Sequence, residues 1–329
     1  MNKIKTIAVL SSGGDAPGMN AGIRAVVRAA INNGMNVKGV LHGYEGLIRG
    51  EFKEMNKVSV SNIINIGGTI LFTARSKEFM QESGQKKALE NLRNENVDAL
   101  VVLGGDGSFR GAYELSKLGM PVIGIPATID LDIACTEYTI GFDTAINTAM
   151  ECIDKLRDTS SSHLRCSVIE VMGRNAGFIA SYSGISTGAE EILIPEDIDF
   201  ANLDSIITRV KIGMKKGKTH YMIIVAEGMS KHLGGTVDIA KRIEDATGIE
   251  TRATVLGYVQ RGGSPTCRDR VMASMMGVHA IKCLLKGDTN RIVILKDGAV
   301  KDIDIKAGIE IKRVFSSEFF DTMDGVESK

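Results

Sequence analysis

Apolar residues in this chain gather in short runs, and between the runs they recur at helical spacing. Residues 6–10 form one such run, and residues 19–31 then place apolar side chains every three or four positions. The same order returns at residues 98–103 and 109–118, on either side of a glycine-rich stretch. The pattern predicts strands that alternate with helices.

The alternation continues through the second half of the chain. The further elements expected there are strand 122–125, helix 145–156, strand 168–172, strand 192–194, helix 206–214 and strand 221–226. Strands without polar alternation are covered on both faces, and helical crossovers make their sheet mostly parallel. Because 329 residues exceed the usual domain size of roughly 100–150, we expect an α/β protein with two doubly wound α/β lobes and mostly parallel sheets.

Composition and charge exclude several classes of function. Forty Lys and Arg balance forty Asp and Glu, so the chain lacks the broad basic field of a nonspecific nucleic-acid binder. No apolar run approaches the ~18 residues of a membrane span or the core of a signal peptide. Five cysteines without a C-x-x-C pair suit reduced thiols better than a disulfide framework or a zinc site. We therefore expect a cytoplasmic protein with no nucleic-acid and no membrane partner.

Glycine is the unusual component, with 37 of 329 residues against an ordinary share of roughly 7%. Glycines follow the expected strands directly around Gly14 and Gly105, where backbone N–H groups and a helix start can bind phosphate. Two such loops suggest one polyphosphate ligand, although a tight turn without a ligand explains either loop alone. Neither loop fits the P-loop pattern G-x-x-x-x-G-K-[ST] and neither is a clean G-x-G-x-x-G, which leaves a Rossmann dehydrogenase as a minor alternative.

Carboxylates accompany the second loop and the next strand end. Asp106 would repel phosphate unless a cation such as Mg²⁺ lay between them, or else it serves as a turn or cap residue. Asp130 and Asp132 follow the strand at 122–125. A carboxylate placed there can accept the proton of a hydroxyl group that attacks a phosphoryl group.

Five segments together resemble the bacterial ATP-dependent 6-phosphofructokinase family. They are residues 12–20, 104–108, 126–132, 172–174 and 260–265, and the likeness runs in order from about residue 6 to about residue 291. The resemblance implies transfer of a phosphoryl group from MgATP to the 1-hydroxyl of fructose 6-phosphate in glycolysis, giving fructose 1,6-bisphosphate. It also implies a nucleotide-binding lobe of residues 1–141 with 256–304 and a sugar-phosphate lobe of residues 142–255 with 305–329.

The resemblance assigns roles to individual residues. Asp130 becomes the catalytic base, with Thr128 beside it and Arg174 countering the transition-state charge. The positions implied for ATP are Gly14, Tyr44, Arg75, Ser76, Gly105, Asp106, Gly107 and Ser108, and Asp106 also holds Mg²⁺. The positions implied for the sugar phosphate are Thr128, Asp130, Arg165, Met172, Gly173, Arg174, Glu227, Arg252, Tyr258 and Arg261.

Two further sets follow from the same resemblance. Arg165 and Arg252 match arginines that reach the 6-phosphate from a neighbouring subunit, which implies a homotetramer. The effector set, for ADP or phosphoenolpyruvate, is Arg24, Arg28, Lys57, Arg157, Lys216 and Lys218; ordinary surface charge is the alternative for these residues.

Several positions depart from the family pattern or distinguish its members. Gly107 and Ala127 stand where pyrophosphate-using relatives carry Asp and Lys, which favours ATP as the donor. Ala127, Leu131 and Tyr258 occupy positions where the family usually has Gly, Asn and His, respectively. Asn62 occupies a position where Asp is common, and residues 134–135 occupy positions where Lys-Gly is usual. Leu131 cannot form the hydrogen bonds of an amide, and Tyr258 carries no imidazolium charge. A weakly active or non-catalytic regulatory homologue, or a kinase of a related phosphosugar, remains the alternative.

Overall fold

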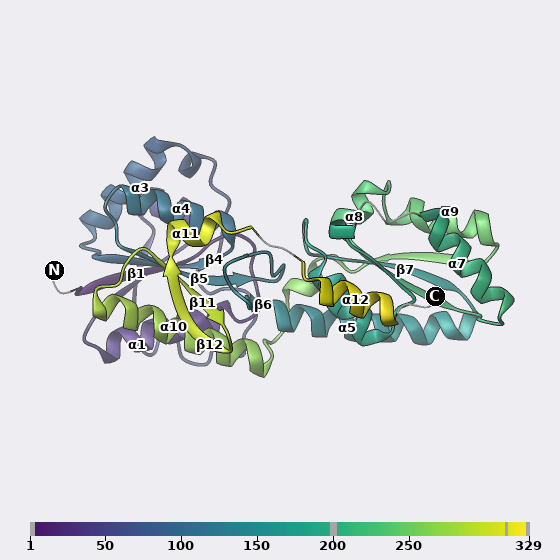
Figure 1. Ribbon diagram of the computed structural model, residues 1–329. Coiled ribbons are helices and arrows are strands. Elements are labelled where there is room, and N and C mark those ends of the chain that lie inside the picture. Colours follow the sequence, from purple (N-terminus) through teal and green to yellow (C-terminus); the bar gives the residue numbers. More distant parts are fainter. Residues whose placement is uncertain (1–3, 198–202, 313–314, 327–329) are drawn as a thin grey trace. The chain divides into compact units, whose positions relative to one another are not determined.

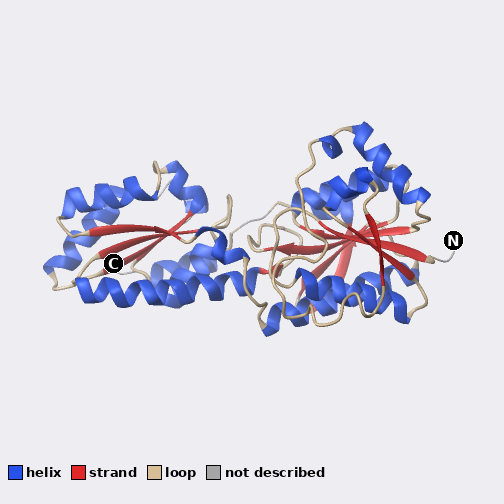
Figure 2. Ribbon diagram, turned by 180° about the vertical axis from the view of Figure 1, so that it is seen from behind, coloured by secondary structure: helices blue, strands red, loops and turns tan. Residues whose placement is uncertain are grey.

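The structure is a computed structural model that describes residues 4–197, 203–312 and 315–326 (Figure 1). The chain separates into two compact units, Met1–Thr144 with Arg261–Arg313 and Ala145–Gln260 with Val314–Lys329. In each unit helices cover both faces of a sheet, as Figure 2 shows, so the predicted doubly wound α/β class is confirmed.

Unit 1 contains, among its described residues, an eight-stranded sheet with the order β12-β11-β5-β4-β1-β2-β3 and with β6 beside β5. Its strands are β1 (Thr6–Ser11), β2 (Asn36–Val40), β3 (Phe52–Met55), β4 (Ala99–Gly104), β5 (Val122–Thr128), β6 (Ile140–Gly141), β11 (Arg291–Lys296) and β12 (Ala299–Asp304). The pairs are parallel except at the two edges, where β3 and β12 run antiparallel to their neighbours. Every residue of β1, β4 and β5 is buried, as expected for apolar runs without alternation.

Helices cover both faces of this sheet. They are α1 (Met19–Asn32), α2 (Gly43–Arg49), α3 (Glu82–Asn94), α4 (Asp106–Lys117), α10 (Cys267–Lys286) and α11 (Ile305–Glu310), with the short 3-10 helix η1 (Glu78–Met80). In Figure 1, α1 and α10 lie on one face, and α3, α4 and α11 lie on the other. The sequence placed residues 305–329 in the second lobe, whereas Ile305 of α11 is buried in the core of unit 1 with Ile292.

Unit 2 is built on a parallel four-stranded sheet with the order β10-β7-β9-β8. Its strands are β7 (Cys166–Val171), β8 (Glu191–Leu193), β9 (Tyr221–Ala226) and β10 (Thr251–Val255). Its helical elements are α5 (Phe142–His163, which begins in unit 1), α6 (Phe178–Thr187), η2 (Pro195–Asp197), α7 (Leu203–Lys215), α8 (Glu227–His232), α9 (Thr236–Thr247), η3 (Gly257–Arg261) and α12 (Ser317–Val326). Apolar residues of α7 and α9 pack on the sheet around Val168, Ile223 and Val225. None of the helices within the described parts of the chain is long and apolar enough to cross a bilayer.

A buried carboxylate joins α10 to the start of α5 inside unit 1. Asp269 is fully buried, and its Oδ1 accepts hydrogen bonds from the Tyr138 hydroxyl at 2.6 Å and the Gly141 N–H at 2.7 Å. Its Oδ2 accepts from the N–H and the hydroxyl of Thr144, at 2.9 and 2.5 Å. Four donors therefore surround one carboxylate, and removing an acceptor leaves buried donors without a partner.

We predict that Asp269→Asn lowers the free energy of unfolding by roughly 3 kcal/mol, because an amide –NH₂ would then face two of the buried donors. Asp297→Asn is the matched control, since Asp297 is exposed and pairs only with Lys301 in the described structure; it should change the free energy by less than about 0.5 kcal/mol. Urea unfolding of both variants measures the difference, and equal stabilities would contradict the structural role of Asp269.

Candidate functional site

Three loops of unit 1 converge at the carboxyl ends of adjacent parallel strands. Ser11 of β1 pairs in register with Leu103 of β4, and Gly104 pairs with Pro126 of β5, so the three strands end at the same edge. A Cβ built on Gly13 would lie 3.4 Å from Ser108 Oγ, which places the first loop against the second. The glycine loops predicted from the sequence are thus neighbours.

The guanidinium group of Arg261 lies over the first glycine loop. The Arg261 Nη1 group donates to the carbonyl of Asp15 at 3.2 Å. A Cβ at Gly14 would come within 2.5 Å of the same nitrogen, so a larger residue would displace this guanidinium from the loop. Arg261, expected at the sugar phosphate, belongs to unit 1 and carries its charge beside the Gly14 loop.

The second loop leads directly into α4. Gly105 is the N-cap residue, and its carbonyl accepts from the N–H groups of Ser108 and Phe109 at 2.9 and 3.1 Å. Asp106 lies in the first turn and pairs with Arg110 at 2.8 Å. It is therefore not the N-cap residue, which was one of the two alternatives to a cation-binding role. A Cβ at Gly107 would meet no atom within 4 Å, which agrees with open space at the position that distinguishes ATP users.

Of the other residues predicted to bind ATP, Tyr44 contacts this loop directly. The buried hydroxyl of Tyr44 donates to the Ser108 carbonyl at 2.5 Å, and its ring stacks on Phe79 at 4.0 Å. Burial raises the pKa of Tyr44 well above its usual value, so the hydroxyl stays protonated and holds the loop. Ser76 accepts from the Phe79 N–H at 3.1 Å, while Arg75 is exposed.

The third loop carries the predicted base. Asp130 is 3% exposed, its N–H donates to Thr128 Oγ1 at 3.2 Å, and that hydroxyl lies 3.5 Å from Asp130 Oδ2. Asp132, two residues later, lines a pocket of about 210 Å³ together with Asp106 and Arg110. Two carboxylates that face one pocket are a suitable donor set for Mg²⁺, which prefers oxygen ligands.

The departures from the family pattern have different structural consequences. Ala127 is an ordinary residue of β5, so the extra methyl group meets no demand for a positive φ. Leu131 has φ 52° and is 3% exposed, which places a buried apolar side chain in the left-handed region that asparagine tolerates better. Asn62 has φ 57°, so its amide side chain suits the backbone there.

In unit 2, a second group of predicted residues meets at the carboxyl edge of its sheet. Residues 172–174 follow β7, and Glu227 follows β9, which pairs with β7. The Arg174 N–H donates to Glu227 Oε1 at 2.6 Å, and the Met172 N–H donates to Gln260 Oε1 at 3.2 Å. Gly173 has φ 136°, and a Cβ there would strike the Ala176 carbonyl, so this tight turn requires glycine.

Arg165 and Arg252 lie at the other end of the same sheet, where its parallel strands begin. Arg165 directly precedes β7, and Arg252 is the second residue of β10. Both guanidinium groups pair with the carboxylate of Glu250, Arg165 Nε at 2.7 Å. Hydrogen bonding from Arg165 is the main reason why the pKa of Glu250 lies below its usual value. The six residues of β7 span about 20 Å between Arg165 and the turn that carries Arg174.

Tyr258, which was predicted to contact the sugar phosphate, lies in η3 and is 82% exposed.

The effector residues fall into two groups, one in each unit. Arg24 and Arg28 lie one turn apart on α1, and Lys57 is exposed after β3. In unit 2, Arg157 donates to the carbonyls of residues 187 and 188, Lys218 pairs with the buried Glu190 at 2.8 Å, and Lys216 is exposed. A common ligand for these groups stays a prediction.

Comparison with known proteins gives consistent matches. A family model described as phosphofructokinase matches residues 6–284. An ATP-dependent 6-phosphofructokinase from Clostridium botulinum is 54% identical over 318 residues, which cover 97% of this chain and 98% of the relative. One from Clostridium acetobutylicum is 54% identical over 319 residues, with the same coverage.

Solved structures agree with these matches. Phosphofructokinase from Pichia pastoris in the T-state has a TM-score of 0.90 and 34% identity, covering 99% of this chain and 42% of that longer chain. The Saccharomyces cerevisiae phosphofructokinase has a TM-score of 0.88 and 32% identity, covering 98% and 49%. A pyrophosphate-dependent phosphofructokinase from Marinobacter aquaeolei has a TM-score of 0.83 at 19% identity, covering 99% and 92%, and shows a likeness of fold alone.

We predict that Leu131→Asn lowers the free energy of unfolding by about 1 kcal/mol. The loss of buried apolar surface, about 2 kcal/mol, exceeds the relief of left-handed strain, about 1 kcal/mol. Asn62→Leu is the matched control, because it places leucine in the same conformation at an exposed site, and it should cost about 1 kcal/mol through strain alone. Denaturant unfolding gives both values. A more stable Leu131→Asn protein would show that strain outweighs burial.

Proposed function

The chain belongs to the phosphofructokinase family, and from this we propose that it transfers the γ-phosphoryl group of MgATP to the 1-hydroxyl of fructose 6-phosphate. The products are ADP and fructose 1,6-bisphosphate. The observation that carries the proposal is the placement of the buried Asp130 beside two glycine loops at one sheet edge, in a chain 54% identical to ATP-dependent 6-phosphofructokinases. A regulatory homologue or a kinase of another phosphosugar is not favoured, because both Clostridium relatives are ATP-dependent 6-phosphofructokinases.

The nucleotide phosphates are proposed to bind at the Gly14 and Gly105 loops. The first backbone N–H groups of a helix have no partner within the helix, so those at the start of α4 can donate to a phosphate at this edge, and the helix dipole favours negative charge there. Arg261 adds a positive charge beside Gly14. Asp106, with Asp132 on the same pocket, would hold Mg²⁺, which neutralises charge on the β- and γ-phosphates when it is bound.

Asp130 is the proposed catalytic base. As the sugar O1 forms its bond to the γ-phosphorus and the bond to the bridging oxygen of ADP breaks, the hydroxyl proton passes to the Asp130 carboxylate. The Thr128 hydroxyl and its contact with the Asp130 N–H fix the orientation of this loop. Arg174 is assigned the counter-charge for the transferring group, and Met172, Gly173 and Glu227 the sugar contacts, by resemblance to the family.

We further infer that the enzyme is a homotetramer that acts in the cytoplasm, with ADP or phosphoenolpyruvate as effector at the basic set on α1 and around Lys218. The separation of about 20 Å along the six residues of β7 supports the assembly, because it keeps Arg165 and Arg252 from serving the site near Arg174 in their own chain. Five cysteines without a disulfide fit a reducing compartment.

We predict that Asp130→Asn lowers kcat by about 10²–10⁴-fold, because the amide keeps the shape of the side chain but cannot accept the proton at neutral pH. A coupled assay for ADP release with ATP, Mg²⁺ and fructose 6-phosphate measures kcat. Nucleotide binding by calorimetry is the control and should be unchanged. Turnover equal to that of the wild type would remove Asp130 from the base role.

A mixing experiment tests the shared site. Arg252→Ala alone should raise KM for fructose 6-phosphate by about 10- to 100-fold, through loss of one charged hydrogen bond to phosphate. Hybrids of Arg252→Ala and Asp130→Asn chains, reassembled from dissociated subunits, should be more active at low sugar phosphate than either parent. Such hybrids contain sites with both residues intact only if Arg252 serves a neighbour. No rescue in verified hybrids would mean that each chain holds a complete site.

A further inference from the structure

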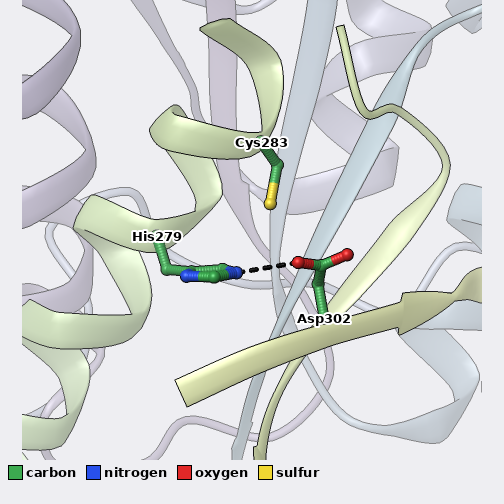
Figure 3. Close-up of side chains that lie close together, drawn as sticks. All are labelled: His279, Cys283 and Asp302. Carbon is green, nitrogen blue, oxygen red and sulfur yellow. Dashed lines mark hydrogen bonds and ion pairs between the residues drawn. The ribbon is translucent and has the colours of Figure 1, made fainter. Parts of the chain in front are cut away.

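A second cluster of metal-ligating side chains lies in unit 1, on α10 and β12. His279 and Cys283 come from α10, and Asp302 comes from β12, as Figure 3 shows. One ligand atom from each, a nitrogen, a sulfur and an oxygen, lie within 4.8 Å of one another. In Figure 1, α10 covers the sheet face opposite to α4 and α11, which line the pocket of Asp106 and Asp132. The cluster is therefore separate from the proposed MgATP site.

The backbone fixes these three side chains before any ion binds. His279 and Cys283 are four residues apart on one helix, so they share a face one turn apart. Asp302 is held opposite Val293 by the antiparallel ladder of β11 and β12. An ion placed among them would find preformed ligands, which lowers the ordering cost of binding.

The cluster is buried on the side of Cys283 and partly exposed on the side of His279 and Asp302. Cys283 is 2% exposed, whereas the side chains of His279 and Asp302 are 23% and 20% exposed. An ion can reach the sulfur past the two outer ligands, and water can complete a fourth position. Three protein ligands and one open position make up a common coordination for Zn²⁺.

Arg291 supports Asp302 from outside the cluster. Its Nε donates to Asp302 Oδ2 at 2.7 Å, while Oδ1 lies 2.9 Å from His279 Nε2. One carboxylate oxygen is thus held by a cation, and the other faces the ligand position, as in outer-shell support of metal ligands. Although burial raises the pKa of Asp302, hydrogen bonds from His279 and Arg291 outweigh it and keep the pKa below its usual value.

The Cys283 thiol must lose its proton before its sulfur can bind a metal ion. Burial and the negative charge of Asp302 raise the pKa of Cys283 to about 12, and Asp288 adds in the same direction while Arg291 acts against it. An ion must therefore displace this proton: the Sγ lone pair bonds to the metal and the proton passes to water. The proton on His279 Nε2 that faces Asp302 must also move, to Nδ1 or to water, so that the Nε2 lone pair can bind the metal. Such displacement is ordinary for thiolate-binding ions and is not open to Mg²⁺, which prefers oxygen ligands.

We propose that His279, Cys283 and Asp302 form a binding site for a divalent transition-metal ion of the Zn²⁺ type. The mixed nitrogen, sulfur and oxygen donor set selects Zn²⁺ or Co²⁺ over the Mg²⁺ used with ATP. The bound ion joins α10 to the β11–β12 hairpin and stabilises unit 1. Its role is structural or regulatory, since none of its ligands lies in the machinery proposed for phosphoryl transfer.

Cobalt is the probe for this site, because a cobalt–thiolate bond gives a charge-transfer absorption band in the near ultraviolet. The full-length protein is stripped with chelator, dialysed and titrated with Co²⁺ in the presence of excess Mg²⁺. We expect one Co²⁺ per chain with this band, and a rise in melting temperature of at least about 3 °C. Absence of the band at saturating Co²⁺ would overturn the proposal.

Variants separate this cluster from other thiols. Cys283→Ser should abolish the band, and His279→Gln should weaken Co²⁺ binding by at least about 10-fold, the scale known even for outer-shell changes. Cys267→Ser is the matched control, since it removes an exposed thiol from the same helix, and it should keep the band. If Cys283→Ser fails to fold, the partly exposed His279→Gln decides the outcome. A band that survives in Cys283→Ser at full strength, an unchanged Co²⁺ affinity in His279→Gln, or a band that disappears in Cys267→Ser would place the metal elsewhere.

Discussion

The register between β1, β4 and β5 is the constraint on which the proposed chemistry depends. These strands are buried along their whole length and pair in parallel. β1 and β4 end within one residue of each other, and β5 continues two residues past the partner of Gly104, so all three end at one edge of the sheet. A slip of one residue would exchange the side chains that face the two helix layers, which would disturb the packing on both faces, and it would also separate the loops that follow. The stability of the apolar layers and the placement of Gly14, Gly105 and Asp130 are therefore consequences of the same pairing.

The sequence predicted the strands that are buried on both faces of the sheet. Runs such as residues 98–103 and 221–226 correspond to β4 and β9 because a strand buried on both faces must be apolar throughout. The edge hairpin β11–β12 was not predicted, although the pair Asp297 and Gly298, with φ values of 53° and 70°, is a strong turn signal. Edge strands are only partly buried, so their apolar pattern is weaker.

The sequence predicted less of the site geometry than of the fold. The glycine loops could be located because each follows an apolar run, but the family resemblance, not spacing, supplied the individual roles. The left-handed backbone of Leu131 could not be read from a residue that normally avoids it. The proximity of Cys283 to Asp302 also depends on a strand brought to α10 by tertiary structure, and neither that strand nor the helix that places His279 and Cys283 on one face was predicted from the sequence.

Glu250 gives the arginine pair of unit 2 a property that neither arginine has alone. Two guanidinium groups held side by side repel each other, and the carboxylate between them serves as an internal counter-ion. In the proposed function, an arriving phosphate takes the place of that carboxylate, so one anion is exchanged for another between the two arginines. An anion of single charge would gain little from the exchange, whereas a dianion would contact both cations with twice the charge of the group it displaces. The proposed site would therefore select its ligand by charge before the sugar contributes any contact.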